Sequence, residues 1–211
     1  MGHLAVKRDH PDYFPLLIMN NILGGGGFTS RIMSRVRSDE GLAYTARSAY
    51  SFGTHYAGSF RAFYQSKSES CAHALQLVLD EIEKIRKEKV SDEELQGAIN
   101  YYVGVFPRNF SSPSTVASTF ADDELTGRPA GFWSKFLDGV RAVKADDVLR
   151  VAKTHLKPEN LTILVVGKMD DILKGDPDNP QYSLKTIAGA KGITEIPLPD
   201  PETLVYPKSG S

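Results

Sequence analysis

The stretch NNILGGGGFTSR, residues 20–31, places four consecutive glycines between an apolar segment and a run that ends in arginine. Such a run can cradle a phosphate, or it can end one helix and lead into the next. A phosphate loop of the Walker type needs a lysine and a hydroxyl residue after its last glycine, but Phe28 stands there. A dinucleotide loop needs its glycines to follow a strand, whereas the residues before these glycines repeat with a helical period. The glycines are therefore predicted to form a left-handed helix cap and a turn into a second short helix, with nucleotide binding as the weakest alternative.

The segments on both sides of the glycines have helical features. Upstream, side chains recur with the period of a helix at Tyr13, Leu16, Leu17, Asn20 and Leu23. Pro11 suits the first turn of that helix. Downstream, Thr29 and Ser30 are good N-caps for a short helix through residues 32–36. Residues 3–8 alternate as a strand does, so the chain is expected to begin with a strand.

Two segments rich in tyrosine, phenylalanine and small residues predict an antiparallel hairpin. They cover residues 42–52 and 55–65 and turn around Gly53 and Thr54. Residues 68–88 then form the clearest helix of the sequence. Its apolar stripe consists of Leu75, Val78, Leu79, Ile82 and Ile85, and its predicted water-facing side chains are Asp80, Glu81, Glu83 and Lys84.

The following segments alternate between helices and one apolar run. Ser91 and Glu94 form the capping box of another helix. Short helices are expected over residues 111–143, and a longer one over residues 144–156. The apolar, β-branched run at residues 160–167 predicts a buried strand.

This order of elements predicts the α+β class, an antiparallel β-sheet with helices packed on one face. Residues 1–168 are expected to form that domain. Residues 169–211 hold many of the prolines and glycines, so they are expected to wrap the same domain as a C-terminal extension. One edge strand within the extension is expected near residues 193–196.

Composition excludes several functional classes. The formal net charge of −1 argues against a nucleic-acid binder. The single cysteine, Cys71, excludes an internal disulfide and a four-thiolate metal site, and its apolar helical setting predicts a buried thiol. No apolar run is long enough to span a bilayer, so a soluble protein of the bacterial cytoplasm or periplasm is expected, with the compartment left open. The N-terminus lacks the pattern of a signal peptide and begins abruptly, which favours a fragment of something longer.

The histidines do not form a recognisable catalytic set. None of His3, His10, His55, His73 and His155 is spaced to share a helical face with another, so the sequence holds no zinc pair of the H-x-x-E-H type. His10 lies beside Asp9 and Asp12, where an exposed turn is favoured over a weak surface metal site. The chain is therefore expected to bind no metal itself.

Arg37 and Tyr44 form the remaining candidate site. Arg37 is predicted to close the second short helix, and Tyr44 to stand on the strand that follows it. A turn through Gly41 could bring the guanidinium and the phenol together. Both are hydrogen-bond donors at neutral pH and suit a substrate carbonyl or a developing oxyanion. The alternative is structural, with Arg37 capping helix carbonyls beside a tyrosine of the sheet.

The same region resembles the insulinase/pitrilysin family of zinc metallopeptidases, in the C-terminal-type half that lacks the zinc ligands. The resemblance rests on NNILGGGGFTSRIMSRVRSDEGLAYTARSAY and is supported by VSDEELQGAINYYVG, VRAVKADDVLRVAKTHLKPENLTILVVG and ITEIPLPDPETL. It covers nearly the whole chain in order. One departure is Glu40, where many relatives have a basic residue, and Glu40 is expected to tune specificity.

The resemblance implies an insulinase-like or mitochondrial-processing-peptidase-like half that clasps a chamber together with a zinc-bearing N-terminal-type half. Zn²⁺ would lie in that other half, within the same polypeptide or in a separate subunit, and would activate water there. Arg37 and Tyr44 match the catalytic and substrate-binding arginine and tyrosine of this half. The substrate would be an extended peptide that pairs with a sheet edge. The isolated chain would then be an inactive part of a metalloendopeptidase.

The runner-up hypothesis is a catalytically inactive scaffold or interaction subunit of the same family. A homodimer is a further assembly left open. Nucleic acid and membrane-spanning partners are not expected.

Overall fold

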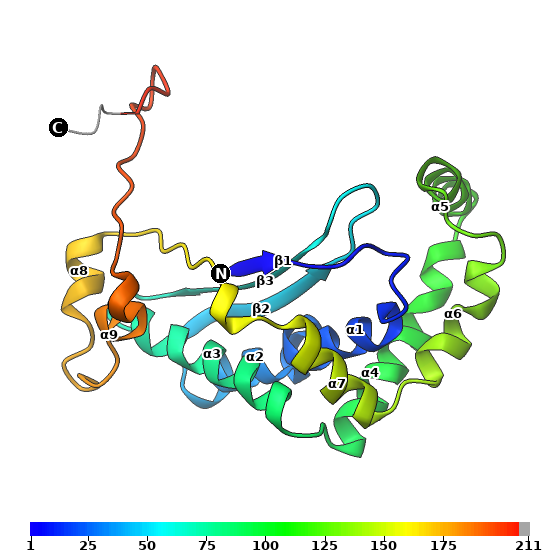
Figure 1. The fold of residues 1–211 in the computed structure, drawn as a ribbon, viewed down its shortest axis with the longest axis horizontal. Coiled ribbons are helices and arrows are strands. Elements are labelled where there is room, and N and C mark those ends of the chain that lie inside the picture. The colour runs from blue at the N-terminus through cyan, green and yellow to red at the C-terminus, as the bar shows by residue number, and fades with distance from the viewer. Residues whose placement is uncertain (207–211) are drawn as a thin grey trace.

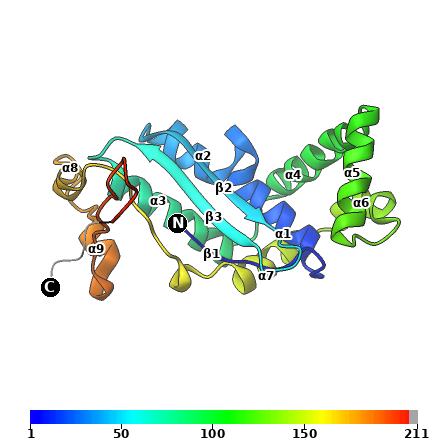
Figure 2. The same cartoon turned by 90° about the horizontal axis from the view of Figure 1, so that it is seen from above.

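A three-stranded antiparallel sheet lies over a layer of helices in the computed structural model, which describes residues 1–206 (Figure 1). The strands are β1 (Gly2–Leu4), β2 (Ala43–Ser51) and β3 (Ser59–Ser66), in the spatial order β1-β3-β2. The helices lie on one side of the sheet, and the other side, here called the open face, is not covered by a helical layer (Figures 1 and 2). The predicted α+β class is confirmed.

The hairpin forms where the sequence predicts it. β2 and β3 pair antiparallel from Ala43 opposite Ser66 to Ser51 opposite Ser59. Small and aromatic side chains such as Ala46, Tyr50, Phe60 and Ala62 alternate toward the helices and are buried. The register slips once, between Ala43 and Thr45, where Tyr44 is left without a partner. The first strand is shorter than predicted, because only Gly2–Leu4 pairs with β3, opposite residues 59–61.

The glycine run differs from the prediction in an informative way. Helix α1 (Tyr13–Asn20) continues as a wide π-helical turn, η1 (Asn21–Gly25), so the helix does not end at the first glycine. A side chain on Gly24 would place its Cβ 2.3 Å from the backbone nitrogen of Ser48, so the turn lies directly against β2. The left-handed residue comes later, at Gly27, with a φ of 68°. The glycines thus serve close packing first and the turn second.

The second short helix follows as predicted, and it too widens. A single 3₁₀ turn, η2 (Gly27–Thr29), leads through Ser30 to α2 (Arg31–Met33), which continues as the π-helical turn η3 (Ser34–Asp39). Arg31 on α2 forms a two-point ion pair with Glu94, with Nε 2.6 Å from Oε1 and Nη2 2.8 Å from Oε2. This pair ties the segment after the glycines to the first turn of helix α4 (Asp92–Val105).

Helices α3 (Cys71–Lys87) and α4 (Asp92–Val105) also confirm the prediction. The Ser91–Glu94 capping box is present at the start of α4. One side chain was placed wrongly, since Glu81 is buried and does not face water. Residues of α2 and η3 pack over this part of α3, and burial raises the pKa of the Glu81 carboxyl while nearby Lys84, Arg31 and Arg35 lower it.

The core lies between the sheet and these helices. Its largest fully buried side chains are Phe60, Leu16, Ile18, Met19, Leu23, Ile32, Leu75, Ile82, Ile85, Leu156, Val36 and Val78. Removal of this apolar surface from water is the main contribution to the stability of the domain. Because α1, η1, α2 and α3 all contribute to one cluster with β2 and β3, the segment that carries Arg37 is fixed against the sheet.

The later helices form one end of the molecule and the floor of the core. Helices α5 (Pro113–Thr126) and α6 (Phe132–Arg141) lie at the end opposite the C-terminal segment, and α7 (Ala145–His155) packs beside α1 and α3 (Figure 1). Helix α5 is longer than the short helices expected for this region. Short 3₁₀ segments connect some elements at Phe106–Phe110, Pro158–Asn160 and Gly189–Lys191.

The predicted buried strand at residues 160–167 is wrong. Only Thr162 bridges to the sheet, opposite Gly2, and Leu164 and Val166 are 69% and 84% exposed. The apolar run is extended, and its backbone pairs with the described sheet only through the two hydrogen bonds between Thr162 and Gly2. The apolar, β-branched composition therefore predicted correctly that this segment is extended, but it predicted wrongly that the segment is buried.

The C-terminal extension packs on the domain through a small second cluster. Helices α8 (Met169–Lys174) and α9 (Leu184–Ala188) bring Ile172 and Leu184 against Cys71 and neighbouring residues at the start of α3. The edge strand expected near residues 193–196 is absent from the described part of the chain. Ile193 and Ile196 are exposed, and the segment runs away from the sheet (Figure 1). Without a free strand alongside, this segment has no ladder to join.

Candidate functional site

Arg37 and Tyr44 lie together at one end of β2. Arg37 is on η3, Tyr44 is on the strand that follows, and the guanidinium carbon lies 5.9 Å from the centroid of the tyrosine ring. A third residue joins them, because the same guanidinium carbon lies 4.6 Å from the centroid of Phe28. The guanidinium is thus within cation–π distance of two aromatic rings. Sequence reasoning named the first two residues and missed Phe28, although a phenylalanine between glycines and a polar N-cap is a visible signal.

Each residue of this cluster lies where the backbone departs from a regular strand or α-helix. Tyr44 occupies the bulge in β2, which turns its side chain outward and leaves it 82% exposed. Phe28 lies on the 3₁₀ turn after the glycines and is 68% exposed. Arg37 lies in a π-helical turn, a feature that is frequent at functional sites. Two large exposed aromatic rings beside an arginine form a surface to which a binding partner can dock.

The charge of Arg37 is not neutralised within the described residues. No carboxylate lies in ion-pair distance of its guanidinium there, whereas the neighbouring Arg35 pairs with Glu40 at 3.0 Å. Glu40, the residue that departs from the family pattern, is thus committed to Arg35. The cluster presents a free guanidinium and a phenolic hydroxyl, which are two donors suited to an oxygen that carries negative charge.

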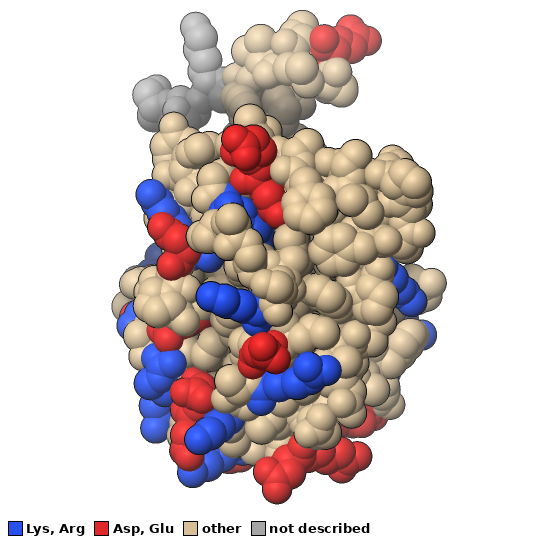
Figure 3. All heavy atoms as spheres, turned by 90° about the vertical axis from the view of Figure 1, so that its right-hand side faces the viewer, with Lys and Arg blue, Asp and Glu red and all other residues tan. Residues whose placement is uncertain are grey.

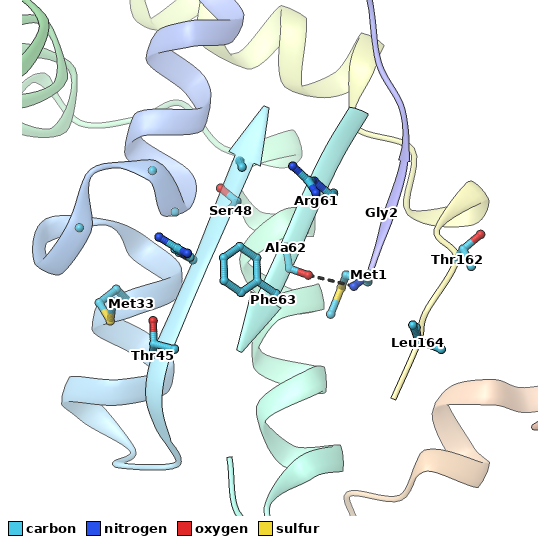
Figure 4. A pocket seen from close by; sticks show the side chains of 15 residues that line it. Met1, Gly2, Met33, Thr45, Ser48, Arg61, Ala62, Phe63, Thr162 and Leu164 are labelled. Carbon is cyan, nitrogen blue, oxygen red and sulfur yellow. Dashed lines mark hydrogen bonds between the residues drawn. The ribbon is translucent and has the colours of Figure 1, made fainter. Parts of the chain in front are cut away.

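A shallow groove on the open face leads away from this cluster. It encloses about 910 Å³ and is lined from the glycine turn, β2, β3 and the segment around Thr162 (Figure 4). Met33 and Thr45 form the part of its wall nearest the cluster, since each is a close neighbour in sequence of Arg37 or Tyr44. The charged side chains among the groove's lining residues are Arg47 and Arg61. The candidate site is therefore a groove with donors at one end and arginines along its floor.

A second polar cluster lies on the far side of α1. His10, Asp12 and His155 have ligand atoms within 4.8 Å of one another, the one group in the described residues that could hold a metal ion. The carboxylate of Asp12 is already engaged, with Arg150 Nη2 2.8 Å from Oδ1 and His155 Nε2 2.7 Å from Oδ2. A guanidinium beside the only carboxylate of this cluster repels a metal cation, so these residues are poorly suited to hold a zinc ion. The cluster is better explained as a clasp between the start of α1 and α7.

This clasp makes a testable contribution to stability. The hydrogen bond from Arg150, with smaller contributions from His155, lowers the pKa of Asp12 to about 2 from an ordinary 3.8. A carboxyl whose pKa is lower in the folded state stabilises the fold above about pH 4, and this stabilisation is lost as the pH falls toward 2. Asp12→Asn is expected to lower the free energy of unfolding at pH 7 by about 1–2 kcal/mol, since the partners are partly exposed to water.

Urea unfolding at pH 7, 5 and 3 measures this effect. The difference between the wild type and Asp12→Asn should shrink at pH 3, and Asp138→Asn, which alters an exposed carboxylate on α6, serves as the control. A difference that stays constant or grows as the pH falls would show that the clasp does not act through the charge of Asp12.

The thiol of Cys71 is not placed to act as a nucleophile. The thiol of Cys71 is buried, as predicted, and burial raises its pKa. The hydroxyl of Tyr64 donates to the carbonyl of Cys71 at 2.8 Å, which holds the start of α3 against β3. His73, also buried, stacks on Tyr182 at a centroid distance of 3.8 Å and so belongs to the packing of the extension.

No helix of the described chain combines the length and apolar character needed to cross a bilayer.

The sequence of this chain is similar to a known family of domains and to proteins related to it. Residues 1–102 match the family described as the Peptidase M16 inactive domain. The chain is 26% identical over 145 residues to a non-peptidase homolog, YmxG, of Helicobacter pylori, covering 68% of this chain and 33% of that protein. It is 25% identical over 171 residues to an uncharacterized zinc protease of Streptomyces coelicolor, covering 81% of this chain and 37% of that protein.

A solved structure of a peptidase M16 inactive domain from Pseudomonas fluorescens has a similar fold. The TM-score is 0.69 at 26% identity, and the match covers 75% of this chain and 38% of the other. This chain spans about a third of the length of the curated relatives that it matches.

Proposed function

Because this chain belongs to the M16 peptidase family as an inactive-type domain, we propose that it is the non-zinc half of a two-half zinc endopeptidase. M16 is the peptidase family of insulinase and pitrilysin, so the family predicted from the glycine and GLAY segments is confirmed. The observation that carries the functional proposal is the pairing of Arg37 with Tyr44 at the end of the open-face groove.

In this proposal the chain contributes binding and electrostatic stabilisation. Arg37 and Tyr44 donate hydrogen bonds to the carbonyl oxygen of the scissile peptide and to the oxyanion that develops from it. The contacts of the guanidinium with Phe28 and Tyr44 would hold it in place, so little rearrangement is needed when the oxygen arrives. Zinc would be held by the other half, where it would supply the activated water, because the described residues of this half offer no matching set of ligands.

The peptide would lie across the open face of this half. The outer edge of β2 is covered at Ser48, where Gly24 of η1 makes its closest approach. An extended peptide therefore finds no free ladder on that part of β2, and the sheet-edge pairing expected from the resemblance would need another strand edge. Glu40 would act on specificity indirectly, by holding Arg35 away from the substrate path.

A scaffold role is the second candidate. A relative of this chain is named a non-peptidase homolog, and that name is consistent with a subunit that assembles without assisting catalysis. Both roles require this chain to assemble with a partner half. The two hypotheses therefore differ only in whether a variant that still assembles loses turnover.

Tyr44→Phe tests the proposal with a minimal change. In the protein assembled from this chain and a zinc-bearing M16 half, loss of the phenolic donor is expected to lower kcat about 10-fold with little change in KM, because a neutral donor that acts mainly on the oxyanion is removed. Tyr56→Phe, at another exposed tyrosine in the hairpin loop, is the matched control. Size-exclusion chromatography reports assembly. Full turnover in Tyr44→Phe would instead support the scaffold role.

A further inference from the structure

The open face of the sheet carries two arginines on adjacent strands. Arg47 on β2 stands opposite Phe63, and Arg61 on β3 stands opposite Ala49, so the two arginines are diagonal neighbours. Both are exposed, while the alternating neighbours Ala46 and Ala62 are buried against the helices. Residues that alternate in this way share one face of a sheet, and diagonal side chains of this length lie within reach of a common ligand.

The two arginines lack carboxylate partners in the described part of the chain. Five other arginines are paired there, namely Arg31 with Glu94, Arg35 with Glu40, Arg86 with Glu83, Arg128 with Asp123 and Arg150 with Asp12. Basic and acidic side chains are also interleaved over the end of the molecule seen in Figure 3. In contrast, the residues that line the groove include no acidic side chain. The floor of the groove is thus a local positive surface on a chain of near-zero net charge.

One of the arginines is already held in place. The guanidinium carbon of Arg47 lies 4.5 Å from the centroid of Phe63, which fixes it over the ring with its donor edge free. Figure 4 shows Arg61 and Phe63 rising from β3 on the same side of the sheet. A fixed, planar guanidinium is well suited to two-point hydrogen bonding with a carboxylate.

We propose that Arg47 and Arg61 form an acid-recognition subsite that binds an aspartate or glutamate side chain of an extended peptide. The inference rests on the proposed function, since it takes the substrate to be a peptide whose scissile carbonyl reaches Arg37 and Tyr44. Along β2, Arg47 lies three residues from Tyr44, and Arg61 is level with Ala49, five residues from Tyr44. At about 3.3 Å per residue these positions lie about 10–17 Å from Tyr44 along the strand. The acidic side chain would therefore stand about three to five residues from the cleaved bond.

Paired peptides test this subsite. Quenched fluorescent peptides of one sequence, with glutamate or glutamine at each position three to five residues from the cleaved bond on either side, are compared in the assembled two-half protein. The wild type is expected to cleave the best glutamate peptide at least about 10-fold faster in kcat/KM than its glutamine partner. The ratio should fall as salt is raised. The double variant Arg47→Gln, Arg61→Gln should lower the ratio to about 1, because the glutamate peptides lose their ionic partners and the glutamine peptides do not.

Two controls keep the outcomes distinct. Arg141→Gln removes an exposed arginine of α6 outside the groove and should leave the ratio unchanged. Charge reversal by Arg47→Glu, Arg61→Glu should shift the preference toward lysine. Cleavage without an acidic preference, or a preference that survives the double variant, would overturn the subsite and leave the proposed function standing. If Arg37→Ala and Tyr44→Phe leave cleavage unchanged, the proposed function fails instead. Fluorescence anisotropy then tests the subsite on the isolated chain, with the same glutamate and glutamine peptides. Tighter binding of the glutamate peptide supports the subsite, and equal binding overturns it.

Discussion

Arg37→Ala is expected to lower kcat of the assembled two-half peptidase by about 10²–10³-fold, the typical effect of removing an oxyanion donor. The guanidinium contacts the rings of Phe28 and Tyr44 and has no carboxylate partner in the described chain, so its charge is available to the substrate oxygen. KM should change much less than kcat, because the interaction is strongest when negative charge has developed. Arg37→Lys should restore only part of the loss, since a point charge replaces the planar fork.

The matched control for this variant is Arg35→Ala. Arg35 lies on the same π-helical turn but pairs with Glu40, so its removal tests charge and local structure without touching the proposed site. Assembly is checked by size-exclusion chromatography for both variants. If the two variants lose turnover equally, or if Arg37→Ala keeps normal turnover, Arg37 has no special role in catalysis.

Gly24→Ala is expected to destabilise the fold by about 3 kcal/mol, because the new methyl group must displace the backbone of β2. The added Cβ would lie 2.3 Å from the nitrogen of Ser48 and 2.6 Å from its hydroxyl oxygen. Ser48 is itself buried and donates a hydrogen bond of 2.8 Å to Asn20, so it has little room to move. A shift of η1 would also move the segment that carries Phe28 and Arg37.

Gly97→Ala is the matched control, measured by the same urea unfolding. Gly97 lies exposed on α4 with no atom within 4 Å of the added Cβ, and alanine favours a helix over glycine by up to about 1 kcal/mol. Gly97→Ala should thus raise stability while Gly24→Ala lowers it. Equal stability of Gly24→Ala and the wild type would show that η1 does not pack on β2 as described.

The sequence predicted helices and strands well where residues close together in the chain determine the structure. The Ser91–Glu94 capping box and the apolar stripe of α3 are such cases, since neighbouring residues determine both. The proximity of Arg37 and Tyr44 also followed from a short connection through Gly41. Phe28 was missed because its contact with Arg37 depends on how two turns after the glycines are oriented.

The failures have a common cause in tertiary structure. Glu81 is buried because α2 and η3, distant in sequence, cover that side of α3. The run at residues 160–167 stays exposed because strand formation needs a neighbouring strand, which no local pattern supplies. The π-helical turns η1 and η3 likewise follow from packing against β2, since their sequences are compatible with an ordinary helix or a turn.

The most direct test of the central claim is a titration of a zinc-bearing M16 half with this chain while peptide cleavage is followed. The account predicts no cleavage by this chain alone, with or without added zinc, and a rise in cleavage that saturates at one chain per zinc-bearing half. The Arg37→Ala variant should assemble at the same ratio and yield only about 10⁻²–10⁻³ of the wild-type kcat. Full cleavage by the zinc-bearing half without this chain, or equal cleavage with the wild type and Arg37→Ala, would contradict it.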